Sequence, residues 1–495
     1  MSVFRIAPRT AALLFPLALS LSGTVSAQTE QGLSHQVSVR SEAVDYQATW
    51  AETVLRDGAG VPQATISTTT YLRSGVRDAA KRPVMFAFNG GPGASSSPLH
   101  AGLLGPKLLG KPGADGKRAL SDNPDTLLDL VDLVLIDPVG TGFSRELKPG
   151  GNNLFWNAAW DASATETVMR EWLQKHKRTT SPVYVVGESY GGYRVGVMAR
   201  NLMDLNIAGL VMVSPALDLA AISGLGPDTP GRLNDQSYVF DLPSMAVTAW
   251  HHKKIGRQDR TVDQVYEEAK TFAMNEYAAA LQQGSDLQST QRDRVAQKMS
   301  GLTGLTSQTI VEWNLRVPMQ DFRELLLPGK VIGRVDSRVS GPKPAAALVA
   351  GRGKAADDPA LGLGKSNVIK SPALGGYIKD AAGYAGNGDY VSLSLDVTLA
   401  WDWRGRSAKF EDNVGSQSTT SLNAFMKAKS QARLLVIGAY FDLATPLLSQ
   451  QYAITHSGLP KERVHFESFA GGHTLYEDNR ADTATALRKF ITASP

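Results

Sequence analysis

A strand that ends in a serine framed by glycines is the feature of this sequence that most constrains its fold. The segment VYVVGESYGGYR, residues Val183–Arg194, runs from β-prone apolar residues into the pattern Gly-x-Ser-x-Gly. Small neighbours permit a sharp turn from strand to helix, and such a turn exposes the serine hydroxyl at the edge of a sheet. The pattern predicts a nucleophile at Ser189. An ordinary turn serine also fits so short a motif, so the surrounding sequence has to decide.

Apolar runs alternate with helical patterns on both sides of this segment. Continuous apolar runs indicate strands covered on both faces, and their alternation with helices indicates a parallel sheet with right-handed crossovers. The expected central strands are RPVMFAF, DLVDLVLID, PVYVVG, IAGLVMV, ARLLVIGA and RVHFESF, and the expected helices include residues 158–176, YRVGVMARNLMDL and ADTATALRKFI. Earlier segments, HQVSVR, DYQATWAETVL and ATISTTTYLR, alternate as antiparallel strands do. Asp161 or Ser163 is available near the start of the helix at 158–176.

The domain organisation follows from where the alternation of strand and helix patterns stops and where it resumes. We expect a signal peptide at residues 1–27, a first core part at 28–216, an inserted and mostly helical cap at 217–390, and a second core part at 391–495. The cap includes a stretch rich in Gly, Pro and Ala, GPKPAAALVAGRGKAADDPALGLG. A separate domain is less favoured than an insertion, because the sheet pattern returns afterwards.

The first residues are typical of an export signal. Arg5 and Arg9 precede the apolar run AALLFPLALSLSG, and Val25–Ala27 fits a small-residue cleavage site. The alternative is a transmembrane anchor, but the run is short for a bilayer. We therefore expect a periplasmic or secreted protein that has no membrane association once the signal is cleaved.

Charge and cysteine content exclude several classes of function. Arg5 and Arg9 carry two of the net +4 charges, and the remaining charge is too small to indicate a nucleic-acid partner. The chain has no cysteine, which excludes disulfides, thiolate metal sites and cysteine nucleophiles. No Lys-Ser/Thr follows the Gly-rich loop at 89–96 and no G-x-G-x-x-G is present, so these glycines do not predict a phosphate site. No cofactor and no metal are expected. The sequence predicts no particular oligomeric state.

Three expected strands end beside residues of complementary chemistry. Ser189, Asp442 and His473 each follow a different strand, and the carboxyl ends of parallel strands border one crevice. A serine needs an imidazole to take its proton, and a carboxylate fixes the tautomer of that imidazole. The chain order Ser, Asp, His is that of an α/β-hydrolase. We therefore expect a catalytic triad on an α/β-hydrolase fold with a mostly parallel sheet, N-terminal antiparallel strands and a helical cap.

Other interpretations of individual residues stay open at this point. Asp442 could begin a turn before Pro446, and Glu188 could be a plain turn residue. A role in the pocket is open for His100, which lies beyond the glycine loop. The remaining histidines are expected to be surface or packing residues.

A glycine loop supplies the expected oxyanion hole. The sequence NGGPGASS, Asn89–Ser96, directly follows the strand VMFAF. Adjacent glycines let backbone N–H groups point into the crevice, where they and the N–H of Tyr190 would bind a developing oxyanion. Losing one such donor typically costs ~3 kcal/mol of barrier lowering, so the loop should matter nearly as much as the triad.

The chain resembles the serine carboxypeptidases, and among them a secreted member of the bacterial type. The segments that carry the resemblance are NGGPGASS, Gly105-Pro106, DPVGTGFS, GESYGG, the Asp442 loop and GGH, which come in the family's order across most of the chain. The resemblance implies removal of single residues from peptides with a free C-terminus. It places the nucleophile at Ser189 with partners Asp442 and His473, the oxyanion amides at Gly91 and Tyr190, and binding of the substrate carboxylate at Asn89 and Glu188.

The expected carboxylate-binding residues have a physical rationale, but other positions of the chain depart from the family pattern. A protonated Glu188 can donate to a substrate carboxylate, whereas an ionised one repels it, and burial would raise its pKa. This predicts activity that favours mildly acidic conditions. Leu103 stands where many members have a glutamate, and Ala87 where a tryptophan is common. Ala94 and Thr474 replace a usual cysteine and methionine.

Three functions remain in competition on these grounds. The first is a secreted serine carboxypeptidase that acts through an acyl-enzyme on peptide substrates. The second, suggested by the altered carboxylate site, is an esterase or acyltransferase on the same scaffold. The third is a hydrolase-like binding protein without catalysis, which the presence of all three triad residue types disfavours.

Overall fold

The structure is a computed structural model that describes residues 32–219, 222, 234–256, 258–345, 354–403 and 418–493. The expected signal peptide at 1–27 lies outside the described residues. None of the helices in the described part combines the length and apolar character that a membrane span needs. The described residues contain no group of acidic and histidine side chains arranged to hold a metal ion.

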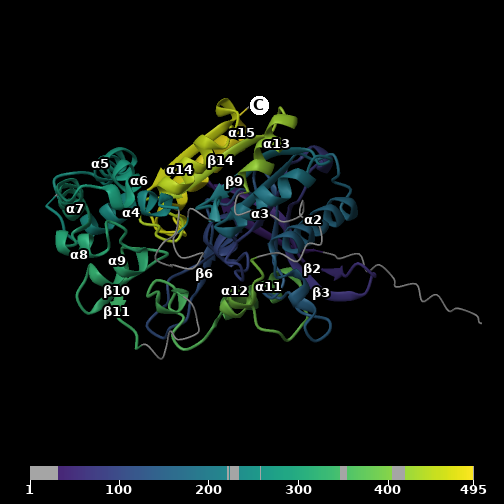
Figure 1. Cartoon of the computed structure of the whole chain (residues 1–495). Coiled ribbons are helices and arrows are strands. Elements are labelled where there is room, and N and C mark those ends of the chain that lie inside the picture. Colours follow the sequence, from purple (N-terminus) through teal and green to yellow (C-terminus); the bar gives the residue numbers. More distant parts are fainter. Residues whose placement is uncertain are drawn as a thin grey trace, which may run out of the picture. The chain divides into compact units, whose positions relative to one another are not determined.

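The described residues contain a sheet of nine strands (Figure 1). Its order is β1 (Leu33–Val39), β2 (Glu42–Arg56), β3 (Pro62–Arg73), β7 (Asp132–Asp137), β4 (Val84–Phe88), β8 (Val183–Glu188), β9 (Ile207–Val213), β14 (Arg433–Ala439) and β15 (Val464–Phe469). The pairs β1–β2, β2–β3 and β3–β7 are antiparallel, and every later pair is parallel. The expected antiparallel N-terminal strands and mostly parallel centre are confirmed.

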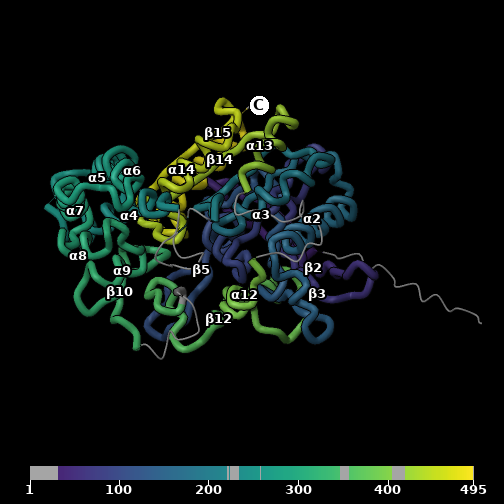
Figure 2. The backbone as a smooth tube through the Cα atoms, in the orientation of Figure 1, coloured from purple at the N-terminus to yellow at the C-terminus, as the bar shows by residue number. Residues whose placement is uncertain are grey.

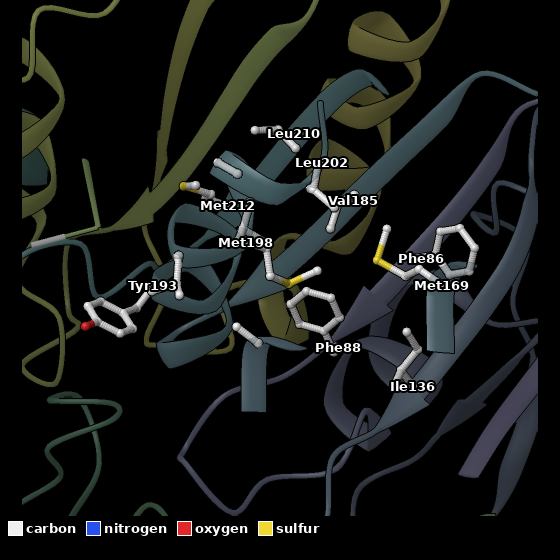
Figure 3. Packing of buried hydrophobic residues seen from close by; sticks show 14 of the residues in the cluster. Phe86, Phe88, Ile136, Met169, Val185, Tyr193, Met198, Leu202, Leu210 and Met212 are labelled. Carbon is white, nitrogen blue, oxygen red and sulfur yellow. The ribbon is translucent and has the colours of Figure 1, made fainter. Parts of the chain in front are cut away.

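Alternate residues of the central strands enter two cores, one on each face of the sheet. Phe86 of β4 and Val185 of β8 belong to one apolar cluster, and their chain neighbours Met85 and Tyr184 belong to the other. This follows from the two-residue period of a strand. The first face is covered by α2 (Ala158–Lys175), α3 (Tyr190–Met198) and α13 (Thr419–Ala428). Figure 3 shows Met169, Tyr193 and Met198 from these helices among strand residues such as Phe86, Phe88 and Ile136.

The second face is covered by α11 (Pro372–Ala382), α15 (Tyr476–Thr492) and a π-helical turn, His100–Leu104, that continues α1 (Ser97–Leu99). The expected closing helix is therefore confirmed as α15. Helix α11 lies in the range assigned to the cap, yet its Leu374 and Ile378 are fully buried in this core cluster. The described residues also form three two-stranded sheets: β5 (Lys107–Leu109) with β6 (Leu120–Asp122), β10 (Lys330–Ile332) with β11 (Ser340–Pro342), and β12 (Val368–Lys370) with β13 (Val391–Ser394).

The start of α2 differs from what the sequence suggested. Asn157, rather than Asp161 or Ser163, caps the helix, and its side-chain oxygen accepts a hydrogen bond from the N–H of Trp160 at 3.0 Å. Asp161 instead forms a buried ion pair with Arg194, because its carboxylate faces α3. Periodicity alone could not distinguish the capping residue from polar residues in the next two helical turns.

A third apolar cluster is built by a helical region between β9 and β14. Its helices are α4 (Gln236–His251), α5 (Val262–Phe272), α6 (Ala278–Gln282), α7 (Ser289–Thr303), α8 (Ser307–Glu312) and α9 (Met319–Leu325), followed by β10 (Lys330–Ile332) and β11 (Ser340–Pro342). Thr261 and Gln264 form a capping box at the start of α5. The cluster also takes in Phe441 and Leu443 from the loop after β14, so the helical region packs directly on that loop.

Segments that are distant in the sequence therefore meet at the carboxyl ends of the central strands. In Figure 2 the yellow segment with β14, β15 and α14 (Leu447–His456) lies beside the teal segment with α3, in keeping with the pairing of β9 and β14. A short helix, α12 (Leu395–Ala400), directly follows β13. The carbonyl of Gly93 accepts the Ser394 N–H at 2.8 Å, and this bond joins the glycine loop to the end of β13.

Candidate active site

Ser189 lies on a strained turn between β8 and α3. Its φ is +61°, a region that residues with a Cβ rarely adopt. The turn is fixed on both sides: the Ser189 N–H donates to the carbonyl of Val213 at 2.9 Å, and its own carbonyl accepts from the N–H of Ala216 at 3.0 Å. The backbone at Ser189 therefore has the strained geometry that the sequence pattern predicted for a nucleophile.

Asp442 and His473 form the second part of the site. Nδ1 of His473 lies 2.6 Å from Oδ2 of Asp442, and the Asp442 side chain is fully buried. Oδ1 of Asp442 accepts hydrogen bonds from the N–H groups of Ala444 (2.7 Å) and Thr445 (3.0 Å), which suit an ionised carboxylate. Because a carboxylate only accepts, Nδ1 carries the proton and Nε2 is left free to act as a base.

The charge of Asp442 also sets the proton affinity of His473. Burial of the imidazole disfavours its charged form, but attraction to Asp442 and the hydrogen bond to it outweigh burial and raise the pKa of His473. Glu188 adds to this attraction and so lies near the same imidazole. A base with a raised pKa gains driving force for proton removal but requires a pH high enough to keep it neutral.

Backbone contacts bring the serine turn to the histidine loop. Ser214 follows the residue that accepts the Ser189 N–H, and its Oγ donates to the carbonyl of His473 at 2.8 Å. Oγ1 of Thr445 lies 3.0 Å from the carbonyl of Ser214 and 2.7 Å from Asp442. Among the described residues no hydrogen bond joins Ser189 to His473. Such bonds are often long in a free enzyme and tighten with substrate.

The glycine loop lies against the start of α3. A Cβ on Gly90 would fall 2.4 Å from the backbone N of Tyr190, so only glycine allows this approach. Gly91 has a φ of +102°, also a glycine conformation. Within the described part of the chain, the N–H groups of Gly91 and Tyr190 have no hydrogen-bond acceptor. Both predicted oxyanion donors are thus available at the junction of loop and helix.

Arg194 holds the glycine loop in position. Its Nε and Nη2 contact the two oxygens of Asp161 at 2.6 and 3.1 Å, while Nη1 donates to the carbonyl of Asn89 at 2.8 Å. Both charged side chains are buried, and a bidentate ion pair of this kind has little freedom to shift. The position of the loop is therefore set from α2 and α3 together.

The two residues expected to bind a substrate carboxylate lie close together. Asn89 and Glu188 are each 2% exposed, and hydrogen bonding from Asn89 acts on the Glu188 carboxyl. Burial raises the pKa of Glu188 to about 7, although the charge of His473 and a hydrogen bond from Tyr476 pull it down. Glu188 is therefore protonated for a large part of the time near neutral pH. Sequence reasoning missed Tyr476, whose hydroxyl donates to Oε2 of Glu188 at 2.5 Å.

The helical region contributes a segment that sequence reasoning also missed. The N–H of His473 donates to the carbonyl of Val335 at 2.6 Å, and the N–H of Leu443 donates to the carbonyl of Arg334 at 3.0 Å. One short segment therefore binds both the Asp442 loop and the His473 loop. Only backbone groups make these contacts, so no side-chain motif could have revealed them.

Three residues discussed from the sequence lie in the core. His100 is buried, and its Nε2 lies 2.7 Å from the hydroxyl of Tyr71, so its ring packs against Tyr71. The pocket role considered for it stays a prediction. Leu103 and Ala87 belong to the same apolar cluster and are almost fully buried. Neither side chain carries a polar group that could bind a carboxylate.

The sheet order and the helices on both faces define an α/β-hydrolase fold. A family model described as Serine carboxypeptidase matches residues 71–470, most of the chain. The protein belongs to the serine carboxypeptidase family, as the sequence motifs suggested. His473 lies just beyond the matched residues.

Individual relatives support the family over shorter stretches. The chain is 30% identical over 173 residues to a carboxypeptidase Y homolog of Arthroderma benhamiae, which covers 33% of this chain and 32% of that protein. It is 28% identical over 160 residues to serine carboxypeptidase-like 38 of Arabidopsis thaliana, covering 30% and 32%. The chain thus matches only about a third of the length of these curated relatives.

A solved structure extends the likeness of fold to nearly the whole chain. The crystal structure of Kex1(Δ)p, a prohormone-processing carboxypeptidase from Saccharomyces cerevisiae, superimposes with a TM-score of 0.55. The match covers 90% of this chain and 91% of that one at 13% identity, a level that speaks for the fold alone.

Proposed function

We propose that this protein is an exported serine carboxypeptidase that removes C-terminal residues from peptides with a free terminal carboxylate. The observation that carries the proposal is Glu188, a buried acid with a pKa raised to about 7 directly beside Ser189. A neutral acid next to the nucleophile can hold a substrate carboxylate by donating to it, and it would be out of place in a site for uncharged esters.

In the acylation step, Oγ of Ser189 attacks the carbonyl carbon of the last peptide bond while Nε2 of His473 takes the hydroxyl proton. The carbonyl oxygen becomes an oxyanion that accepts from the N–H groups of Gly91 and Tyr190. The imidazolium, stabilised by Asp442, then gives its proton to the leaving nitrogen. The C–N bond breaks, the terminal amino acid departs, and an ester to Ser189 remains.

In the deacylation step, a water molecule attacks the ester while His473 takes one of its protons. The oxyanion forms and collapses again, and the proton passes to Oγ of Ser189. The shortened peptide leaves with a new carboxylate, and the enzyme returns to its first state without a cofactor being consumed.

A panel of three substrates tests the proposal: a blocked dipeptide with a free C-terminus, its C-terminal amide, and the corresponding simple ester. We expect kcat/KM for the free acid to exceed that for the amide by at least ~10-fold at pH 6, since one charge-assisted hydrogen bond of ~1.5–3 kcal/mol is made only by the acid. Amino-acid release followed by chromatography gives the rates. Turnover of the ester alone would instead identify an esterase or acyltransferase, which the apolar Leu103 and Ala87 favour, and no turnover of any substrate would identify a binding protein.

The location of the enzyme and the division of its chain are further proposals. Residues 1–27 are proposed as a cleaved signal peptide, which implies a periplasmic or secreted enzyme acting on peptides. The ranges 28–216 and 391–495 are proposed as the two core parts, with 217–390 as the inserted cap.

A further inference from the structure

The Glu188 carboxyl has unequal surroundings at its two oxygens. Oε2 accepts the hydroxyl of Tyr476 at 2.5 Å, a short hydrogen bond in a site that is almost completely buried. The side chain of Asn89 also hydrogen-bonds the Glu188 carboxyl. The proton on a neutral Glu188 therefore belongs on Oε1, because Oε2 is already occupied by a donor.

Tyr476 reaches this carboxyl because of where its helix begins. It is the first residue of α15 and follows His473 by one short turn. Its ring lies across the π-helical turn, where a Cβ on Gly102 would fall 2.7 Å from the ring carbon Cε2. Any residue larger than glycine at that position would push the ring away from Glu188. The neighbouring Leu103 is buried and apolar, so its side chain supplies no donor.

We propose that Tyr476 positions Glu188 for substrate binding: its hydroxyl holds Oε2 and so leaves Oε1 to carry a proton toward the terminal carboxylate of a peptide. This inference rests on the proposed carboxypeptidase function. Tyr476 does not itself touch the reacting atoms and acts through Glu188, although its hydroxyl also has a hydrogen bond with the Asn89 side chain.

Of the pair Glu188 and Tyr476, only Glu188 changes its protonation state in this arrangement. Neutral Glu188 donates its Oε1 proton in a hydrogen bond to the substrate, and ionised Glu188 must first take up one proton from solvent. Tyr476 keeps its own proton throughout, because burial and the nearby Glu188 raise the pKa of its hydroxyl. The other groups that act on Glu188 are His473 and Asn89, which lower its pKa, and Glu477, which raises it.

The pH profile of kcat/KM for the free-acid peptide reveals this role. In the wild-type enzyme kcat/KM should fall about tenfold per pH unit above about pH 7, as Glu188 ionises. Tyr476→Phe removes a hydrogen bond that favours the ionised form. We expect kcat/KM of the Tyr476→Phe enzyme to begin to fall about one pH unit higher than in the wild type. Its KM at pH 6 should be raised about fivefold and its kcat nearly unchanged.

Two comparisons separate this role from a loss of packing. Tyr184→Phe removes a hydroxyl from the strand that carries Glu188, one that donates to the Ile491 carbonyl at 3.2 Å, and should leave the profile as in the wild type. Replacement of Tyr476 by 3,5-difluorotyrosine keeps the ring and makes its hydroxyl a stronger hydrogen-bond donor. The fall in kcat/KM should therefore begin at a lower pH than in the wild type. These opposite shifts from Phe and difluorotyrosine cannot both come from damage to the fold.

The outcomes distinguish the inference from the function on which it rests. A wild-type fall above pH 7 that neither substitution moves would overturn the role of Tyr476 and leave the carboxypeptidase standing. A wild-type profile for the free acid without such a fall would remove Glu188 from carboxylate binding, and the inference with it. The amide substrate, which has no terminal carboxylate, should show no shift with either substitution.

Discussion

Ser189→Ala is expected to lower kcat for a free-acid peptide by at least ~10⁴-fold, the largest effect of any substitution in the site. Alanine lacks the oxygen that forms the acyl-enzyme, so the reaction is left with binding and oxyanion stabilisation alone. KM should change little, because the hydroxyl contributes mainly to the transition state. Single-substrate kinetics with purified protein, free of contaminating peptidases, give both constants.

A matched substitution guards this result against effects of folding. Ser163→Ala changes an exposed serine on α2 and should retain wild-type kcat. Alanine adopts a positive φ no more easily than serine does, so the Ser189→Ala protein should unfold at nearly the wild-type temperature. A Ser189→Ala protein with near-native kcat would refute the assignment of the nucleophile.

Asp442→Asn is expected to lower kcat near neutral pH by about 10⁴-fold while the geometry of the site is preserved. The amide is almost the same size as the carboxylate and can keep its contacts with the N–H groups of Ala444 and Thr445. It cannot stabilise the imidazolium, and its N–H₂ group favours the wrong tautomer of His473. The pKa of His473, raised by Asp442 in the wild type, should fall.

A double substitution provides the internal control for this prediction. Residues of a triad act as a unit, so Asp442→Asn combined with Ser189→Ala should be no slower than Ser189→Ala alone. Multiplied losses would mean that the two residues act independently. An Asp442→Asn enzyme within about tenfold of wild type would contradict the pairing seen at 2.6 Å.

The sequence was sufficient for the fold and for the candidate triad, because both follow from local patterns. Apolar runs located β8 and β14, and chemistry-bearing residues directly after strand ends pointed to Ser189, Asp442 and His473. The position of Asp442 was predictable in this way because parallel strands end at a common edge. The glycine loop after the strand VMFAF indicated the oxyanion hole, and the family resemblance then added Asn89 and Glu188 as carboxylate-binding residues.

What could not be predicted depends on contacts between distant segments. Val335 binds the His473 loop through its backbone carbonyl, a group that every residue carries. Tyr476 is one tyrosine among 14, and only the packing of its ring on Gly102 brings it to Glu188. The packing of α11 on the second core was likewise hidden, since its amphipathic pattern does not say which apolar surface it covers.

Covalent labelling tests the central claim, that Ser189 is an activated nucleophile beside a histidine–aspartate pair. The protein would be treated with a fluorophosphonate, assayed for peptidase activity over time, digested, and analysed by mass spectrometry. We predict one adduct per chain, on the peptide that contains Ser189, formed in step with the loss of activity. Full inactivation with the adduct on a different residue, or activity that persists while Ser189 is fully labelled, would contradict it.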